Sequence, residues 1–151
     1  MLTAIPVGLD EILDTFGDPG DPGFEAEHIL LFSLPYPLMY NWQSVTQSRC
    51  HRLVVENFQA AFEAVRDAGF EDQVKHYGGI YVKRSIRGRT AFPSTHSWGI
   101  AIDLEPEKYP LGSAARFPDE IVAIFAQFGF FYGGDFKSRR DPMHFQLCRG
   151  Y

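Results

Sequence analysis

Two short segments of the sequence carry residues that could hold a metal ion. In the first, Ser94–Leu104, His96 precedes a stretch that alternates strictly from Gly99 onward. Successive side chains of a strand point to opposite faces, so Asp103 should share a face with Gly99 and Ala101, while larger apolar residues fill the other face. Two very small residues followed by a carboxylate leave room for a group against the sheet. A turn after His96 could bring its imidazole over that face.

The second segment is Asp141–Leu147. In an extended chain, His144 and Gln146 share one face of the strand. Pro142 cannot donate a hydrogen bond to the ladder, so the strand should begin after it. Asp141 is therefore expected in a turn, from which its carboxylate can reach the site that His144 faces.

Two imidazoles and one carboxylate form a ligand set typical of catalytic zinc, which keeps a further coordination position for water. We therefore expect His96, Asp103 and His144 to bind one zinc ion. Zinc lowers the pKa of water from about 15.7 towards about 7 and so supplies a nucleophile at neutral pH. Asp141 is the natural candidate for a general base that does not bind the metal. Because the chain has five histidines, spacing alone leaves open that these two are ordinary surface or core residues.

The composition is that of one ordinary globular domain. The chain has 151 residues, of which 45% are hydrophobic and 22% charged, and its formal net charge is −5. An acidic chain argues against a nucleic-acid partner, which would favour a basic stripe. Two local exceptions are the basic runs at 83–89 and 137–140. Each run is interpreted either as a solvated surface or as part of an anion site between them.

The sequence also suggests where the protein is made. The N-terminus has neither a basic region nor a long apolar stretch, so we expect no signal peptide, no membrane span and synthesis in the cytoplasm. Cys50 and Cys148 form no C-x-x-C pair. Two reduced, partly buried thiols are favoured over a disulfide.

The elements that must position these residues suggest an α+β class with a small, mainly antiparallel sheet and flanking helices. We expect a single domain over 1–151, in which 1–33 form an N-terminal extension of unclear role. Apolar spacing and turn residues predict helices and loops. Helices are predicted at 9–16, 51–68 and from Pro118 to 129, a loop at 17–23, irregular structure at 28–42, and strands at about 79–84, 98–105, 130–133 and 143–148.

The two chemical segments together resemble a known family. S-x-H-x6-D at 94–103, followed by D-x-x-H-F at 141–145, is similar to the zinc D-alanyl-D-alanine carboxypeptidases. That family includes vancomycin-resistance D,D-peptidases and phage endolysins that cut L-alanyl-D-glutamate bonds. The upstream segment 78–88, with paired glycines, an aromatic residue and R-x-x-R-G, resembles the phage branch. The similarity spans about residues 34–149 and implies the fold shared by these peptidases and the Hedgehog signalling domain.

The resemblance assigns roles to individual residues. His96, Asp103 and His144 match the three zinc ligands, and Asp141 matches the catalytic carboxylate. Arg84 matches the arginine that binds or polarises the substrate near the scissile bond. Two further residues are implied in substrate binding, namely Ser94 and Arg87.

The implied activity is hydrolysis of amide bonds in the stem peptides of bacterial peptidoglycan. The sequence does not separate a D,D-carboxypeptidase from an endopeptidase of the L-alanyl-D-glutamate type. A non-catalytic, Hedgehog-like zinc-binding module is the alternative outside enzymes. We expect a monomer that contacts neither nucleic acid nor membrane and reaches the cell wall after phage-type release or as a virion component. Targeting to the wall is expected to be weak or to depend on residues 1–45.

Overall fold

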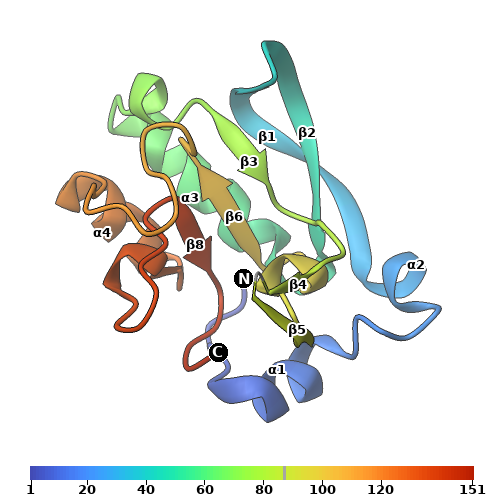
Figure 1. The fold of residues 1–151 in the computed structure, drawn as a ribbon. Helices are drawn as coiled ribbons and strands as arrows, with labels where there is room; N and C mark the ends of the chain where they lie inside the picture. Colours follow the sequence, from blue (N-terminus) through green and yellow to red (C-terminus); the bar gives the residue numbers. More distant parts are fainter. Residues whose placement is uncertain (87) are drawn as a thin grey trace.

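The computed structural model describes residues 1–86 and 88–151 and confirms the α+β class. Its centre is a four-stranded antiparallel sheet in the order β3-β6-β8-β7 (Figure 1). The four strands are β3 (Tyr77–Gly79), β6 (Ala101–Leu104), β8 (His144–Gln146) and β7 (Phe131–Tyr132).

A long hairpin lies beside this sheet (Figure 1). It pairs β1 (Ile29–Tyr40) with β2 (Gln43–His51), so the expectation of irregular structure over 28–42 is wrong. The two prolines that suggested irregularity fall where the register shifts, between Ser33 and Leu38. A proline is tolerated at such an irregularity because no ladder hydrogen bond is needed there.

The predicted helices are present. α1 spans Gly8–Phe16, α3 spans Val55–Asp67 and α4 spans Asp119–Gln127, while a short α2 over Phe24–His28 was not expected. α1 begins one residue earlier than expected, and α3 and α4 are shorter than expected. The predicted start of α3 is a 3-10 turn, in which Leu53 is exposed although its spacing placed it on the buried face. The other 3-10 turns are η2 (Glu71–Gln73), η3 (Thr95–Trp98) and η4 (Gly133–Asp135).

The predicted strand at 79–84 is largely wrong. β3 ends at Gly79, and the chain then runs to a separate two-stranded ribbon of β4 (Ser85–Ile86) and β5 (Arg89–Pro93). Ile80 is fully buried without belonging to a strand. A short apolar run predicts burial here, whereas strand pairing depends on a partner that periodicity does not reveal.

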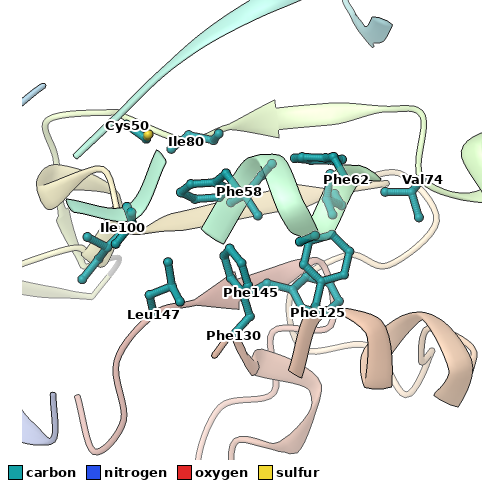
Figure 2. Packing of buried hydrophobic residues seen from close by; sticks show 14 of the residues in the cluster. Cys50, Phe58, Phe62, Val74, Ile80, Ile100, Phe125, Phe130, Phe145 and Leu147 are labelled. Atoms are coloured by element: carbon teal, nitrogen blue, oxygen red, sulfur yellow. The ribbon is translucent and has the colours of Figure 1, made fainter. Parts of the chain in front are cut away.

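The core is built largely from phenylalanine. Phe58 and Phe62 on α3 point towards Phe125 of α4 and Phe145 of β8 (Figure 2). The ring centroids of Phe125 and Phe145 are 4.5 Å apart, and those of Phe62 and Phe125 are 5.9 Å apart. Such offset and edge-to-face pairs add to the free energy gained by burying their area. This cluster holds α3 and α4 against the sheet that carries the candidate site.

Truncating the centre of this cluster should destabilise the fold strongly. Phe125→Ala removes a fully buried ring, and we expect the free energy of unfolding to fall by about 3–5 kcal/mol. Trp42→Ala is the matched control, because Trp42 is 89% exposed at the hairpin tip and should change stability by less than about 0.5 kcal/mol. Urea titration of both variants measures the difference. Equal effects would contradict this description of the core.

Residues 1–33 pack onto the same core. Ile12, Phe16 and Phe24 are buried in the cluster that contains the sheet. The indole Nε1 of Trp98 donates to the carbonyl oxygen of Gly17 at 2.8 Å. Because Trp98 closes the η3 turn that carries His96, the N-terminal segment supports the element that carries one predicted ligand.

A buried histidine, His51, also hydrogen-bonds to the N-terminal segment 1–33. The His51 Nδ1 accepts from the Leu53 N–H at 3.2 Å, so Nε2–H donates to the Phe16 carbonyl at 3.1 Å. Burial lowers the pKa of His51 to about 4, although the bond to Phe16 opposes the shift. The neighbouring positive charges are those of Arg52 and, when protonated, His28, whose ring stacks on His51.

This neutral imidazole should make stability depend on pH. In the unfolded chain His51 has a pKa near 6.5. Its contribution to the free energy of unfolding is therefore complete above that pH and is lost as the pH falls towards 4. Between pH 6.5 and 4.5 the loss should reach about 2 kcal/mol. Urea titrations across this range measure it. A His51→Gln variant should be less stable at pH 7 but should lack this part of the pH dependence, and an unchanged profile would contradict the assignment.

Both cysteines are buried and unpaired, as the sequence predicted. Burial raises the pKa of each thiol to about 12, which leaves little thiolate at neutral pH. In the described part of the chain, no helix combines the length and apolarity needed to cross a lipid bilayer.

Candidate metal centre

Strand pairing places two of the predicted ligands side by side. Asp103 on β6 lies directly opposite His144 on β8, and its other neighbour is Gly79 on β3. The backbone of β3 approaches closely, because a Cβ on Gly78 would lie 2.9 Å from the Cβ of Asp103. The paired glycines of the sequence motif therefore let β3 lie tightly against the strand that carries the carboxylate.

The third ligand comes from the turn before β6. His96 lies in η3, and the Ser94 side chain caps this turn by accepting from the His96 N–H at 3.4 Å. Gly99 ends the turn in the left-handed region, with a φ of 69°. A Cβ there would also meet the His51 backbone nitrogen at 2.9 Å, so only glycine fits. The turn brings the buried imidazole back over the face that carries Asp103.

The three ligand atoms are spaced as a metal site requires. The Oδ1 atom of Asp103 is 3.2 Å from His96 Nε2 and 2.9 Å from His144 Nδ1, and the two nitrogens are 3.3 Å apart. Ligands about 2.0–2.1 Å from a tetrahedral zinc ion lie about 3.3 Å from one another. These donors therefore fit three corners of a tetrahedral zinc site, and they form a group able to hold a metal ion.

The backbone orients the first imidazole for this role. His96 Nδ1 lies 2.9 Å from the carbonyl oxygen of Ile80. A carbonyl oxygen only accepts, so Nδ1 carries the proton and Nε2 presents its lone pair to the cluster. The fully buried Ile80 thus provides a fixed carbonyl that orients His96.

The carboxylate of Asp103 is held in its charged form. Burial alone would raise the pKa of Asp103, but hydrogen bonds and charge from His144 and His96 in their protonated form outweigh it and leave this pKa well below its usual range. The guanidinium of Arg84 lies 4.0 Å from the second carboxylate oxygen. An ionised carboxylate beside two imidazole nitrogens is a ligand set suited to a divalent cation.

Arg84 is fixed through its backbone by a residue that the sequence analysis did not single out. The Ser97 hydroxyl accepts from the Arg84 N–H at 2.9 Å and donates to the Arg84 carbonyl at 2.7 Å. Because Ser97 belongs to the same turn as His96, this bridge ties the position of Arg84 to that of a ligand. Its signal in the sequence is a serine directly beside the first histidine.

Asp141 lies beside the cluster without belonging to it. Its backbone contacts Gly133 so closely that a Cβ on Gly133 would meet the Asp141 carbonyl oxygen at 2.4 Å. Within residues 1–86 and 88–151, its buried Oδ1 has no hydrogen-bond partner. Burial raises the pKa of Asp141, while the nearby His144 opposes that shift. A carboxylate with a raised pKa and an unpaired oxygen is suited to accept a proton.

These residues face one cavity of about 540 Å³. The predicted metal ligands Asp103 and His144 line it, together with Asp141, Arg84 and Ser94. Lys137 and Arg139 from the second basic run also line it. The fold therefore brings parts of both basic runs to the same cavity, an arrangement expected of an anion site and not of two separate solvated surfaces.

The outcome for the other predicted residues is mixed. Ser94 lines the cavity, where it was expected, and also caps the η3 turn, which was not foreseen. Arg87 lies outside the described residues. Two buried residues next to His144, Thr95 and Gln146, were given no role, although the strand pattern placed Gln146 on the same face as His144.

A known protein family matches the part of the chain that contains the candidate metal ligands. Residues 87–147 match the family described as D-alanyl-D-alanine carboxypeptidase, which confirms the predicted resemblance over that span. The matched span contains all three proposed ligands and Asp141, whereas Arg84 lies just before it. No curated protein matches the chain significantly.

Proposed function

We propose that this chain, in which residues 87–147 match the D-alanyl-D-alanine carboxypeptidase family, is a zinc metallopeptidase acting on the stem peptides of bacterial peptidoglycan. The central observation is the convergence of two imidazole nitrogens and one carboxylate oxygen at mutual distances of 2.9–3.3 Å. Beside them lies a cavity lined by Asp141, whose Oδ1 has no hydrogen-bond partner among the described residues. A structural zinc site is usually closed by four protein ligands and needs neither feature.

His96, Asp103 and His144 would hold the zinc ion. When bound, zinc supplies Lewis acidity, which lowers the pKa of water and polarises a carbonyl group. Asp141 would accept a proton from the attacking water at Oδ1 and return it to the leaving amine, so that water adds across the amide and releases an acid and an amine. The raised pKa of Asp141 favours the first half of this transfer, in which the carboxylate takes up the proton.

Arg84 would stabilise the negative charge that develops on the carbonyl oxygen. Its guanidinium lies at the edge of the ligand cluster and faces the cavity. Its backbone is held on both sides by Ser97. Loss of one such donor elsewhere costs about 3 kcal/mol of transition-state stabilisation.

The charges around the cavity favour an anionic substrate. Arg84, Lys137 and Arg139 contribute positive charge to its wall. Of the acidic residues described there, Asp103 belongs to the ligand cluster, Asp135 is paired with Arg116, and Asp141 is the proposed proton acceptor. Stem peptides carry a D-glutamate and a terminal carboxylate, which suits this arrangement.

The experiment that tests the function is digestion of purified peptidoglycan by the zinc-loaded protein, with mass spectrometry of the products. Free D-alanine would identify a D,D-carboxypeptidase, and longer released peptides would identify an endopeptidase. Both activities should disappear with a chelator and return with zinc. Zinc binding without any released product would favour the non-catalytic, Hedgehog-like module and would contradict the proposal.

An endopeptidase result would support the finer part of the proposal, a lytic enzyme of the phage endolysin type. Cleavage inside the stem peptide separates crosslinked strands, whereas removal of a terminal D-alanine leaves existing crosslinks intact. Lysis of permeabilised cells by the endopeptidase, measured as a fall in turbidity, would test that role directly.

A further inference from the structure

The two nitrogens of His144 face different surroundings. Nδ1 points to the ligand cluster, 2.9 Å from the Asp103 carboxylate and 3.3 Å from His96 Nε2. Nε2 lies 2.9 Å from the side-chain oxygen Oε1 of Gln146. A neutral imidazole that binds a metal through Nδ1 must carry its proton on Nε2. The group facing Nε2 therefore determines whether Nδ1 is available as a ligand.

The side-chain amide of Gln146 has only one orientation that fits its partners. Its Nε2 lies 3.2 Å from the carbonyl oxygen of Cys148, which can only accept a hydrogen bond. The amide NH2 group must therefore be on that side, and Oε1 must face His144. Since Oε1 also only accepts, a hydrogen bond between the two side chains requires His144 Nε2 to donate.

Thr95 supports the same arrangement. Its hydroxyl Oγ1 lies 3.3 Å from Gln146 Oε1 and 3.3 Å from His144 Nε2. A hydroxyl that donates to Oε1 keeps its lone pairs turned to the imidazole N–H. Thr95, His144 and Gln146 are all buried, so water does not compete for these groups. With a metal bound at Nδ1, a His144 without a proton on Nε2 would place two bare acceptors 2.9 Å apart in this environment. Without the metal, the Asp103 carboxylate, also 2.9 Å away at Nδ1, competes with Gln146 for the same proton.

We propose that Gln146 is a positioning residue that holds the proton of His144 on Nε2 and so keeps Nδ1 free to bind the metal. This inference rests on the proposed zinc site. The backbone of Gln146 pairs with Ala101 on β6 and Phe131 on β7. That pairing does not involve the side chain, so loss of the amide should affect the imidazole more than the sheet.

The first test measures zinc affinity by competition with a chromogenic chelator. Gln146→Leu keeps much of the side-chain volume but removes the acceptor, and should weaken zinc binding by about 10–100-fold. Gln146→Glu retains an acceptor towards His144 and should recover most of the affinity. Asn57→Leu is the matched control, because Asn57 is also a buried amide bonded to backbone carbonyls, those of Leu2 and Phe128. Its zinc affinity should equal that of the wild type.

The second test observes the tautomer directly. Long-range ¹H–¹⁵N NMR of the metal-free protein, at a pH where its histidines are neutral, should show a fraction of the His144 proton on Nε2, in competition with Asp103 at Nδ1. In Gln146→Leu that fraction should fall measurably, a change that a purely structural role would not produce.

Zinc affinity of Gln146→Leu within twofold of the wild type would overturn the proposal. So would an Nε2-protonated fraction of His144 that is the same in Gln146→Leu as in the wild type. If Gln146→Leu does not fold, Gln146→Glu still decides, because its stronger acceptor should raise that fraction above the wild-type value. If the wild type binds no zinc, the proposed function fails, but the metal-free spectrum still tests the role of Gln146 separately.

Discussion

Replacing Asp141 with asparagine is expected to lower the turnover of a wall peptide by about 10²–10⁴-fold while leaving zinc bound. Asparagine has nearly the same shape as aspartate, so the position of the neighbouring His144 should be preserved. An amide, however, cannot accept and return the proton that amide hydrolysis requires. The unpaired Oδ1 of Asp141 and its raised pKa make it the carboxylate suited to this transfer.

The measurement compares kcat with zinc content in the same preparations. Asp135→Asn is the control, because Asp135 also lines the cavity but is paired with Arg116. It should retain turnover within a few-fold of the wild type. Near-normal turnover of Asp141→Asn would remove Asp141 from the mechanism. Loss of zinc from Asp141→Asn would show instead that Asp141 is a ligand, which also contradicts the assignment.

The helices were predictable because their signals are local. The apolar residues of α3 recur at helical spacing and Gly69 follows it, while Pro118 precedes α4. The hairpin of β1 and β2 was missed because two prolines suggested irregularity, although both fall where the register shifts. Its turn contains Asn41 and Trp42, both with positive φ. Tryptophan is rare in that conformation, so turn chemistry gave no warning.

The candidate site was more predictable than the fold around it. Alternation along β6 placed Asp103 on a face of small residues, and the same argument placed His144 on β8. The sequence could not show that these two strands pair with Asp103 opposite His144. The sequence also could not show which groups hydrogen-bond to the histidine ligands. The Ile80 carbonyl belongs to the backbone, and the orientation of the Gln146 side-chain amide leaves no pattern in the sequence.

The most severe loss is expected from His96→Ala, which should abolish both zinc binding and turnover. His96 contributes one of three ligand atoms and is buried, with only 1% of its surface exposed. No described residue within the cluster could replace it, since the group consists of His96, Asp103 and His144 alone. With two ligands left, the site should no longer hold zinc at the concentrations used for assay.

This loss should also be visible in stability, independently of activity. A ligand that binds only the folded state stabilises it by about 4 kcal/mol when its free concentration is 1,000-fold above Kd. Zinc should therefore raise the Tm of the wild type and leave that of His96→Ala unchanged. His76→Ala is the matched control, because the His76 imidazole contacts Glu105 outside the cluster. It should keep the zinc-dependent rise.

Comparison of the two histidine variants therefore separates a metal centre from a chance cluster of polar residues. In a chance cluster, His96→Ala would alter stability equally with and without zinc, because only the hydrogen bonds to Asp103 and Ile80 would be lost. In a metal centre, the difference between wild type and variant grows with zinc concentration. Stoichiometric zinc in His96→Ala, measured by elemental analysis, would contradict the three-ligand site itself, whatever the activity assay shows.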